Sequence, residues 1–252
     1  MRKFIFLLAN IMILFFFACD KEENDIQPIE VEYGSVSDID GNIYKTIIIG
    51  SQEWLAENLK TTKYNDGTPI LHKPNNDDWY NSTEGAYAWY NNDISNKDKY
   101  GALYNWYAVD SEKLCPTGWR VPSHEDWKIL EGMVDSKFGV GDNEWTDWSK
   151  ECRGYDVGKK LKAISGWYKD GNGIDAIGFA AIPGGYRYID GSFYYAGKYV
   201  QWWNRDVDIL TNTTISTTSS NRVILYKKDC IYRHSGKALY GHYIRCVMEV
   251  VK

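Results

Sequence analysis

The amino terminus decides the compartment in which the rest of this chain must fold. Arg2 and Lys3 precede an almost unbroken apolar run over Phe4–Phe17, and Ala18 then stands before a single cysteine, Cys19. A basic start, an apolar run of about 7–15 residues and a small residue at the cut form a secretory signal peptide. The run is too short for a membrane span, which takes about 20 apolar residues. The remaining residues therefore fold outside the cytoplasm, where disulfides persist.

A cysteine at the cut resembles the bacterial lipobox, in which this cysteine is acylated and becomes the first residue of the mature chain. We therefore predict a lipoprotein signal peptide over residues 1–18, lipidation of Cys19, and a lipid anchor in the bacterial outer membrane. The alternative is an ordinary secretory signal followed by a chance cysteine.

Residues 19–33 are predicted to be a flexible acidic tether, because they lack a hydrophobic period and cannot bury enough surface to become ordered. Lys21, Glu22 and Glu23 are similar to signals that send some lipoproteins across the outer membrane, which favours exposure at the cell surface. A solvated periplasmic linker would have the same composition, so both faces of the membrane stay open.

Charge and length limit the partners and the domain count. Without its signal peptide the chain has 27 basic against 34 acidic residues, and its lysines are scattered, so it has no electrostatic footprint for nucleic acid. Residues 34–252 are within the range of one elaborated β-rich domain.

Four cysteines remain in this domain, and an even count in an exported protein favours disulfides. Three pairings are possible, of which we favour Cys115 with Cys246 and Cys152 with Cys230. A zinc site is the alternative, although no C-x-x-C pair or clustered His/Cys spacing is present.

Local patterns predict two hairpins, one clear helix and late strands. The hairpins lie at 43–55 and 186–195, the second around an Asp190-Gly191 turn of type I′. Ser123 caps a helix whose apolar period runs to Phe138, with Gly139 as its stop, and a shorter helix is expected at 158–164. Residues 211–221 form a loop or an edge strand, and strands follow at 223–226 and 243–250. The fold class is α+β.

Several long segments together resemble the Fibrobacter succinogenes major domain family of exported bacterial lipoproteins and surface proteins. They lie at 40–46, 49–59, 100–108, 115–123, 178–187 and 244–247. They include Glu53-Trp54-Leu55-Ala56-Glu57-Asn58-Leu59, Cys115-Pro116-Thr117-Gly118-Trp119-Arg120 and Ile244-Arg245-Cys246-Val247. Two of these segments also resemble formylglycine-generating-enzyme-like and C-type-lectin-like domains. That resemblance implies a twisted antiparallel sheet with two helices and long irregular loops, and ligands bound on the loop side.

No pattern for an enzyme is present. His124, Glu125 and Asp126 are consecutive at a predicted helix start, where acidic groups meet the helix dipole, so capping is favoured over acid–base catalysis. A formylglycine-generating activity would need a reduced cysteine pair, whereas structural disulfides explain these cysteines better. We predict no cofactor.

A calcium site is a further candidate, at Asn204 and Asp206. Calcium-dependent lectins use Trp-Asn-Asp, and amide and carboxylate oxygens are suitable ligands for Ca²⁺. Arg205 interrupts that triplet here and adds a positive charge. We favour the alternative, a core strand that ends in a polar turn.

Aromatic residues in predicted loops are the general candidates for binding, because a sugar ring can lie flat on an aromatic ring while Asn and Asp orient its hydroxyls. The candidates are Trp79, Tyr80, Trp145, Trp148, Trp167, Tyr168, Tyr194 and Tyr195. The alternative for each tryptophan is packing against its own loop.

These observations predict a non-enzymatic, surface-exposed binding module for a glycan or another surface protein, similar to an adhesin. Two alternatives stay open: a structural or accessory subunit of an envelope or fimbria-like assembly, and an extracytoplasmic enzyme related to formylglycine-generating proteins.

Overall fold

The structure is a computed structural model that describes residues 31–147, 149–207 and 218–250. The predicted signal peptide, Cys19, nearly all of the predicted tether and Trp148 lie outside the described residues. Strand β1 begins at Gly34, where the sequence analysis places the start of the domain. Among the described residues, no helix has the length and apolar character needed to cross a membrane.

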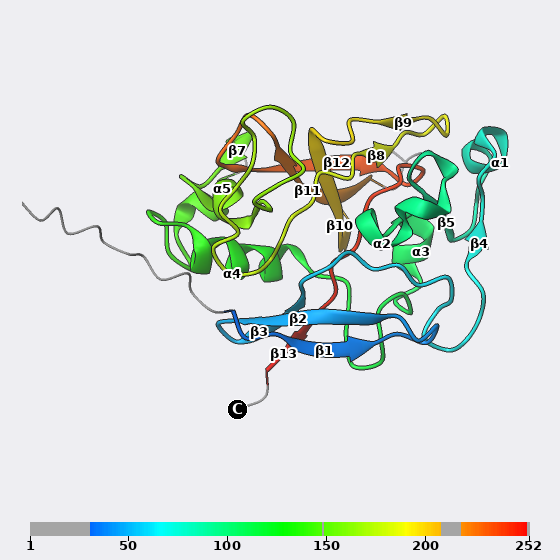
Figure 1. The fold of residues 1–252 in the computed structure, drawn as a ribbon, viewed down its shortest axis with the longest axis horizontal. Coiled ribbons are helices and arrows are strands. Elements are labelled where there is room, and N and C mark those ends of the chain that lie inside the picture. The colour runs from blue at the N-terminus through cyan, green and yellow to red at the C-terminus, as the bar shows by residue number, and fades with distance from the viewer. Residues whose placement is uncertain (1–30, 148, 208–217, 251–252) are drawn as a thin grey trace, which may run out of the picture.

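The first and last strands of the domain belong to one antiparallel sheet. Its order is β1 (Gly34–Ser37), β2 (Ile43–Ile49), β3 (Gln52–Leu55) and β13 (Val247–Glu249). The predicted hairpin of β2 and β3 is confirmed, with Gly50 between the strands at a positive φ of 64°. Figure 1 shows this sheet as a separate layer, with the remaining elements on one side of it.

A second antiparallel sheet contains the longest strands. Its order is β10 (Tyr199–Val207), β11 (Thr218–Leu225), β12 (Ile231–Lys237) and β7 (Cys152–Arg153). The prediction for residues 211–221 is a loop or an edge strand. Residues 218–221, the part of this segment that the structure describes, lie instead in β11, which pairs with a strand on each side. Ser219 and Ser220 are buried there, and both are hydrogen-bonded: the Ser220 hydroxyl accepts from the Asn204 side-chain amide, and the Ser219 hydroxyl donates to the Asn204 carbonyl.

The remaining elements are short, and the class is α+β with mostly antiparallel strands. The smaller sheets contain β4 (Leu71–His72), β5 (Ala86–Trp89) and β6 (Ala102–Tyr104), and β8 (Tyr186–Arg187) with β9 (Phe193–Tyr194). The helices are α1 (Asn76–Tyr80), α2 (Lys97–Tyr100), α3 (Trp106–Asp110), α4 (His124–Val134) and α5 (Val157–Leu161). Single 3-10 turns cover Tyr90–Asn92, Ile94–Asn96 and Asn143–Trp145.

Helix α4 begins as predicted and ends one turn early. The Ser123 hydroxyl accepts a hydrogen bond from the Asp126 backbone N–H, and the Asp126 carboxylate accepts one from the Ser123 N–H, which together form a capping box. The expected continuation to Phe138 and Gly139 is wrong. Asp135 leaves the helix with an extended backbone, and its carboxylate accepts hydrogen bonds from backbone N–H groups of the next loop and of residues 155–157.

Aromatic side chains between α4 and the two large sheets form the centre of the core. The ring centroid of Trp127 lies 5.0 Å from that of Trp54 and 5.6 Å from that of Trp202, and Phe179 packs edge-on against all three. Such pairs add about 0.5–1.5 kcal/mol each beyond their buried area.

Arg245 lies fully buried beside this cluster, with its guanidinium 4.5 Å from the Phe179 ring. It donates hydrogen bonds to the backbone carbonyls of Leu55, Phe179 and Ala180 and to the Asn58 side chain. Burial lowers the pKa of Arg245 to about 9. The side chain therefore joins β3, the loop around Phe179 and the segment before β13.

Two disulfides bind distant segments, in the pairing favoured from the sequence. Cys115 is bonded to Cys246, next to Arg245, and Cys152 to Cys230. The cysteines of the first disulfide are 131 residues apart in the sequence, and those of the second are 78 apart. In the chain-entropy account, a disulfide that closes a long loop removes more conformational entropy from the unfolded chain. All four cysteines of the domain are used.

Replacing Arg245 by glutamine should reduce the free energy of unfolding by about 3 kcal/mol or more, because buried carbonyls would lose their donor. Arg205→Gln is the matched control, since Arg205 is exposed, and it should change stability by no more than about 0.5 kcal/mol. Chemical denaturation of both variants measures the difference. Equal stabilities for the two variants would contradict the role given to Arg245.

Candidate functional site

The tryptophans predicted to bind ligand are buried where the structure describes them. Trp79, Trp145 and Trp167 are at most 5 % exposed. Each indole N–H donates to a backbone carbonyl: Trp79 to Leu239, Trp145 to Gly139 and Trp167 to Ala181. These three rings are therefore not exposed as the loop positions led us to expect: Trp145 and Trp167 belong to the main hydrophobic core, and Trp79 belongs to a smaller buried cluster.

The predicted tyrosines are exposed, but they do not form one surface. Tyr80 lies at the end of α1 and Tyr168 in the loop after α5, whereas Tyr194 and Tyr195 belong to the β8–β9 hairpin. Tyr194 and Tyr195, which are 41 % and 46 % exposed, line a small hollow that adjoins the pocket described next.

The open face of the β10–β11–β12 sheet forms the floor of a pocket of about 350 Å³, which we call the tyrosine pocket. Side chains alternate across a strand, so residues that pair across strands share a face. One row across the sheet is Gln201, Val223 and Tyr232, and the next contains Asn221 and His234. These residues line the pocket together with Glu151, Tyr199 and Leu225.

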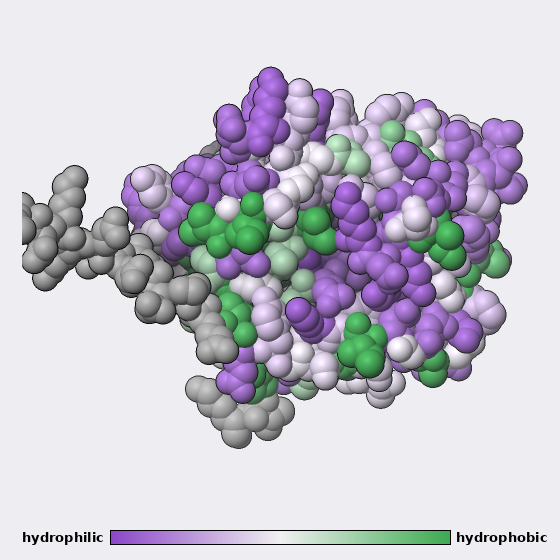
Figure 2. Space-filling model, in the orientation of Figure 1, coloured by the Kyte–Doolittle hydropathy of each residue, from purple (hydrophilic) through white to green (hydrophobic). Residues whose placement is uncertain are grey.

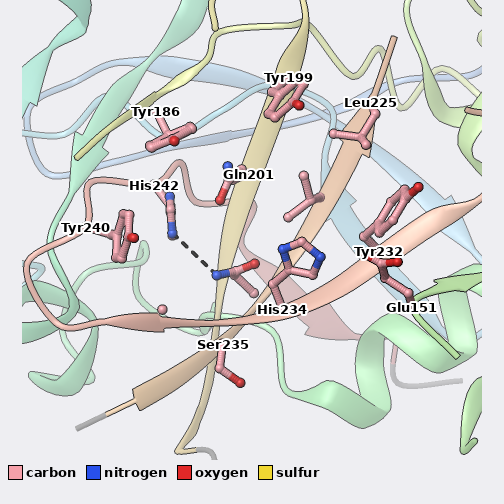
Figure 3. Close-up of a pocket in the computed structure, with 13 residues that line it drawn as sticks. Glu151, Tyr186, Tyr199, Gln201, Leu225, Tyr232, His234, Ser235, Tyr240 and His242 are labelled. Carbon is pink, nitrogen blue, oxygen red and sulfur yellow. Dashed lines mark hydrogen bonds between the residues drawn. The ribbon is translucent and has the colours of Figure 1, made fainter. Parts of the chain in front are cut away.

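Aromatic rings from other segments form one side of the tyrosine pocket. Figure 3 shows Tyr186, His242 and Tyr240 on one side of β10, and Leu225, Tyr232 and Glu151 on the other. Tyr240 stacks on His242 with centroids 5.5 Å apart, and both centroids lie 6.1 Å from that of Tyr186.

The tyrosine surface continues onto the β8–β9 hairpin. A smaller hollow of about 180 Å³ is lined by four tyrosines: Tyr186, Tyr188, Tyr194 and Tyr195. Because Tyr186 also lines the tyrosine pocket, the two hollows adjoin. Burial and neighbouring tyrosines raise the pKa of Tyr186 to about 12, so its hydroxyl remains protonated at neutral pH.

The hairpin exists as predicted, but its turn differs. Gly191 has a φ of +87° while Asp190 does not have a positive φ, and the N–H of Tyr188 donates to the carbonyl of Ser192. A type I′ turn needs two positive φ values, so this is a three-residue loop with a glycine bulge. Gly185, at φ +73°, leads into the hairpin where a Cβ would lie 2.3 Å from the Tyr194 carbonyl oxygen.

Arg187 fixes the hairpin to the rest of the domain. The residue is fully buried, and its guanidinium lies 4.2 Å from the Trp79 ring and 4.8 Å from the Phe193 ring. It donates to the carbonyls of Gly191 within the hairpin and of Lys73 before α1. Burial lowers its pKa to about 10. The tyrosines are thus held in place by a buried cation beneath them.

His242, on the aromatic side of the tyrosine pocket, is neutral. It is 1 % exposed, and burial lowers its pKa to about 3. Its Nε2 lies 3.4 Å from the amide nitrogen of Asn221, and its ring lies 4.2 Å from that of Trp203. The buried Nδ1 of His242 and Oδ1 of Asn221 have no hydrogen-bond partner among the residues that the structure describes.

The predicted calcium candidates, Asn204 and Asp206, both lie in β10 and contact other protein groups, although Oδ1 of Asn204 has no hydrogen-bond partner among the described residues. Asn204 is buried in β10, and its amide nitrogen donates to the Ser220 hydroxyl at 2.5 Å. The Asp206 carboxylate accepts from the backbone N–H of His124 at the start of α4. The core strand of the favoured alternative is present, but its polar turn is not at this position, because β10 continues through Asn204 and Asp206 to Val207. Within the described ranges, no group of three His, Cys, Asp or Glu residues is arranged to hold a metal.

The predicted capping role is present in the run from His124 to Asp126: Asp126 caps the start of α4, and His124 contacts buried arginines. Asp126 forms the capping box and an ion pair with Arg120. The His124 ring lies between Arg222 and Arg233, and burial with these cations lowers its pKa to about 2. Arg222 is paired in turn with the buried Glu131 of α4.

Comparison with known proteins identifies one family. The family model described as Fibrobacter succinogenes major domain matches residues 47–248. No curated protein and no solved structure matches the chain.

The buried histidines should make the protein less stable in weak acid. Below the ordinary histidine pKa of 6.5 the unfolded chain binds protons, whereas folded His242 stays neutral down to about pH 3. Stability therefore falls as pH falls, and His242 alone should account for about 2 kcal/mol between pH 7 and pH 5. Glu131 opposes the trend at lower pH, because burial raises its pKa.

Denaturation of His242→Gln at pH 7, 6 and 5 checks this expectation. The variant should be less stable at pH 7 but should lose less stability on acidification than the native protein. His72→Gln, at an exposed histidine, should keep most of the native slope. Identical slopes for both variants would show that His242 does not titrate as described.

Proposed function

The chain belongs to the Fibrobacter succinogenes major domain family, and on this premise we propose that it is a lipid-anchored, non-enzymatic protein whose tyrosine pocket binds a saccharide. The observation that carries the proposal is the combination of aromatic side walls and a neutral polar floor. Tyr186 and Tyr240 offer flat ring faces, and Gln201 and Asn221 offer amide groups below them. Few polar groups placed among aromatic ones are typical of sugar and other small-molecule pockets.

The pocket is suited to an uncharged ligand. Its volume of about 350 Å³ is at the lower end of the usual range for small-molecule sites, which fits one or two sugar rings. His242 is neutral. Among the described residues that line the pocket, Glu151 at the edge is the one that carries a carboxylate. Nδ1 of His242 and Oδ1 of Asn221 are hydrogen-bonding groups of the lining residues that have no partner among the described residues.

A C-type-lectin-like fold and a non-enzymatic role are parts of the same proposal. The mostly antiparallel sheets, the single long helix α4 and the long loops are consistent with that fold. The two disulfides use all four cysteines of the domain, which leaves no reduced pair for a formylglycine-generating reaction. Figure 2 shows a mostly hydrophilic face with apolar residues in small separate groups, as expected of a domain that stands in water.

Removing one ring from the pocket should weaken saccharide binding. We expect purified full-length protein, in detergent, to bind members of a neutral oligosaccharide panel in calorimetry. Tyr186→Ala and Tyr240→Ala should each raise the Kd about tenfold through lost ring contacts.

Tyr80→Ala and Tyr155→Ala are the matched controls, because both tyrosines are exposed elsewhere. They should leave the Kd within twofold. Binding of no saccharide by folded protein would contradict the proposal. Stoichiometric cross-linking of the pocket tyrosines to another envelope protein in intact cells would favour an assembly subunit instead.

Membrane attachment depends on Cys19 in this proposal. Cells fed radioactive palmitate should label the native protein, and protease added to intact cells should remove the domain if it is displayed outside. Cys19→Ser should abolish the label and release the protein from the membrane fraction. A labelled Cys19→Ser variant, or an unlabelled and freely soluble native protein, would contradict the anchor.

A further inference from the structure

A second hollow, of about 520 Å³, lies between α5 and the turn that joins β11 to β12. We call it the lysine pocket. It shares no lining residue with the tyrosine pocket, and α5 lies at the opposite end of the molecule from α1 (Figure 1). Its lining consists of Lys159, Lys162, Lys169, Asp170, Gly171, Asn172, Tyr226, Lys227 and Asp229.

Positive charge exceeds negative charge in this pocket although the whole chain has a net charge of -5. Four lysines line it against two aspartates. Among the described residues, no ion pair within 4 Å involves Lys159, Lys169 or Lys227, and all three side chains are exposed. Converging lysines without carboxylate partners create a local positive potential that attracts anions.

Lys162 adds a fixed charge beneath the exposed lysines. Its side chain is 2 % exposed, and its ammonium group donates to the Lys228 carbonyl at 3.0 Å, while the Asp229 carboxylate lies 3.9 Å away. Because these contacts hold the Lys162 side chain in place, its charge contributes to the positive electrostatic potential of the pocket from a fixed position.

The walls of the lysine pocket are fixed before any ligand binds. The Cys152–Cys230 disulfide joins the β11–β12 turn to β7, and the hydrogen bond from the Gly158 N–H to the Asp229 carbonyl joins the same turn to α5. On the other side, a Cβ on Gly171 would lie 2.7 Å from the Tyr226 carbonyl oxygen, so glycine permits the loop to pack there. A preformed site spends little binding energy on ordering its loops.

Aromatic rings stand beside the lysines. Tyr168 is 43 % exposed and packs edge-on against Tyr226, with centroids 5.5 Å apart. The ammonium group of Lys169 lies 5.4 Å from the Tyr168 centroid, and that of Lys227 lies 5.3 Å from the Tyr226 centroid. A ligand that offers both a carboxylate and a flat C–H face can use the two kinds of group together.

We propose that the lysine pocket binds an acidic saccharide, with uronic-acid carboxylates on Lys159, Lys169 and Lys227 and a sugar ring against Tyr168. The exposed ring beside the charges favours a saccharide over an acidic peptide. This site is separate from the proposed function, and either can fail without the other.

The test measures binding of galacturonate oligomers to the full-length protein in detergent by calorimetry. Added salt should weaken binding, because it screens exposed charges. The triple variant Lys159→Gln, Lys169→Gln and Lys227→Gln should raise the Kd at least tenfold. The control triple Lys45→Gln, Lys99→Gln and Lys137→Gln removes the same charge from exposed lysines elsewhere and should stay within twofold.

Two further measurements separate the competing explanations. Tyr186→Ala should leave galacturonate binding unchanged, which distinguishes this site from the tyrosine pocket. Polyglutamate of equal charge should bind at least tenfold more weakly than the saccharide. Equal losses in the two lysine triples, equal binding of polyglutamate, or no binding by folded native protein would each overturn the proposal.

Discussion

The rest of this structure depends on the hydrogen bonds that two buried arginines, Arg245 and Arg187, donate to backbone carbonyls. Each lies at 0 % exposure, and each directs its guanidinium hydrogens at backbone carbonyls of irregular segments. A buried carbonyl without a donor costs about 1–3 kcal/mol, so long loops can be packed inside a domain only if something supplies donors. Arginine suits this role, because it offers five donors in a rigid plane and stacks on aromatic rings.

The tyrosine pocket depends on this arrangement. Its floor is one face of the β10–β11–β12 sheet, but its aromatic side comes from the β8–β9 hairpin and from the segment between β12 and β13. Arg187 holds the hairpin against the loop before α1, while a bridge between Arg187 and Gly241 places the second segment beside it. The same sheet buries Trp202 and Arg222 on its other face. One side of the sheet therefore faces the core, and the other carries the candidate binding surface next to the buried Trp203.

Sequence patterns predicted correctly those elements that are stabilised by residues close together in the chain. The capping box at Ser123 and the β2–β3 hairpin follow from neighbouring residues, and both are present. The end of α4 was predicted wrongly, because Asp135 bonds to residues 155–157, twenty positions later. The loop tryptophans were placed at the surface for a similar reason: the carbonyls that accept from Trp79 and Trp167 lie 160 and 14 residues away.

By itself, the sequence determined the family, the α+β class and the hairpin of tyrosines, since each follows from neighbouring residues or from long shared segments. Tyr199 and Gln201 are two residues apart in one strand, and Tyr232 and His234 are two apart in another. Residues at that spacing share a face, so the sequence already indicated a polar and aromatic face on both strands. Only the tertiary structure decided that this face meets Tyr186, Tyr240 and His242. It also decided that scattered lysines converge beside α5. The physical reason is that both pockets are made by contacts between segments far apart in the chain, and no local pattern encodes which surfaces those contacts bring together.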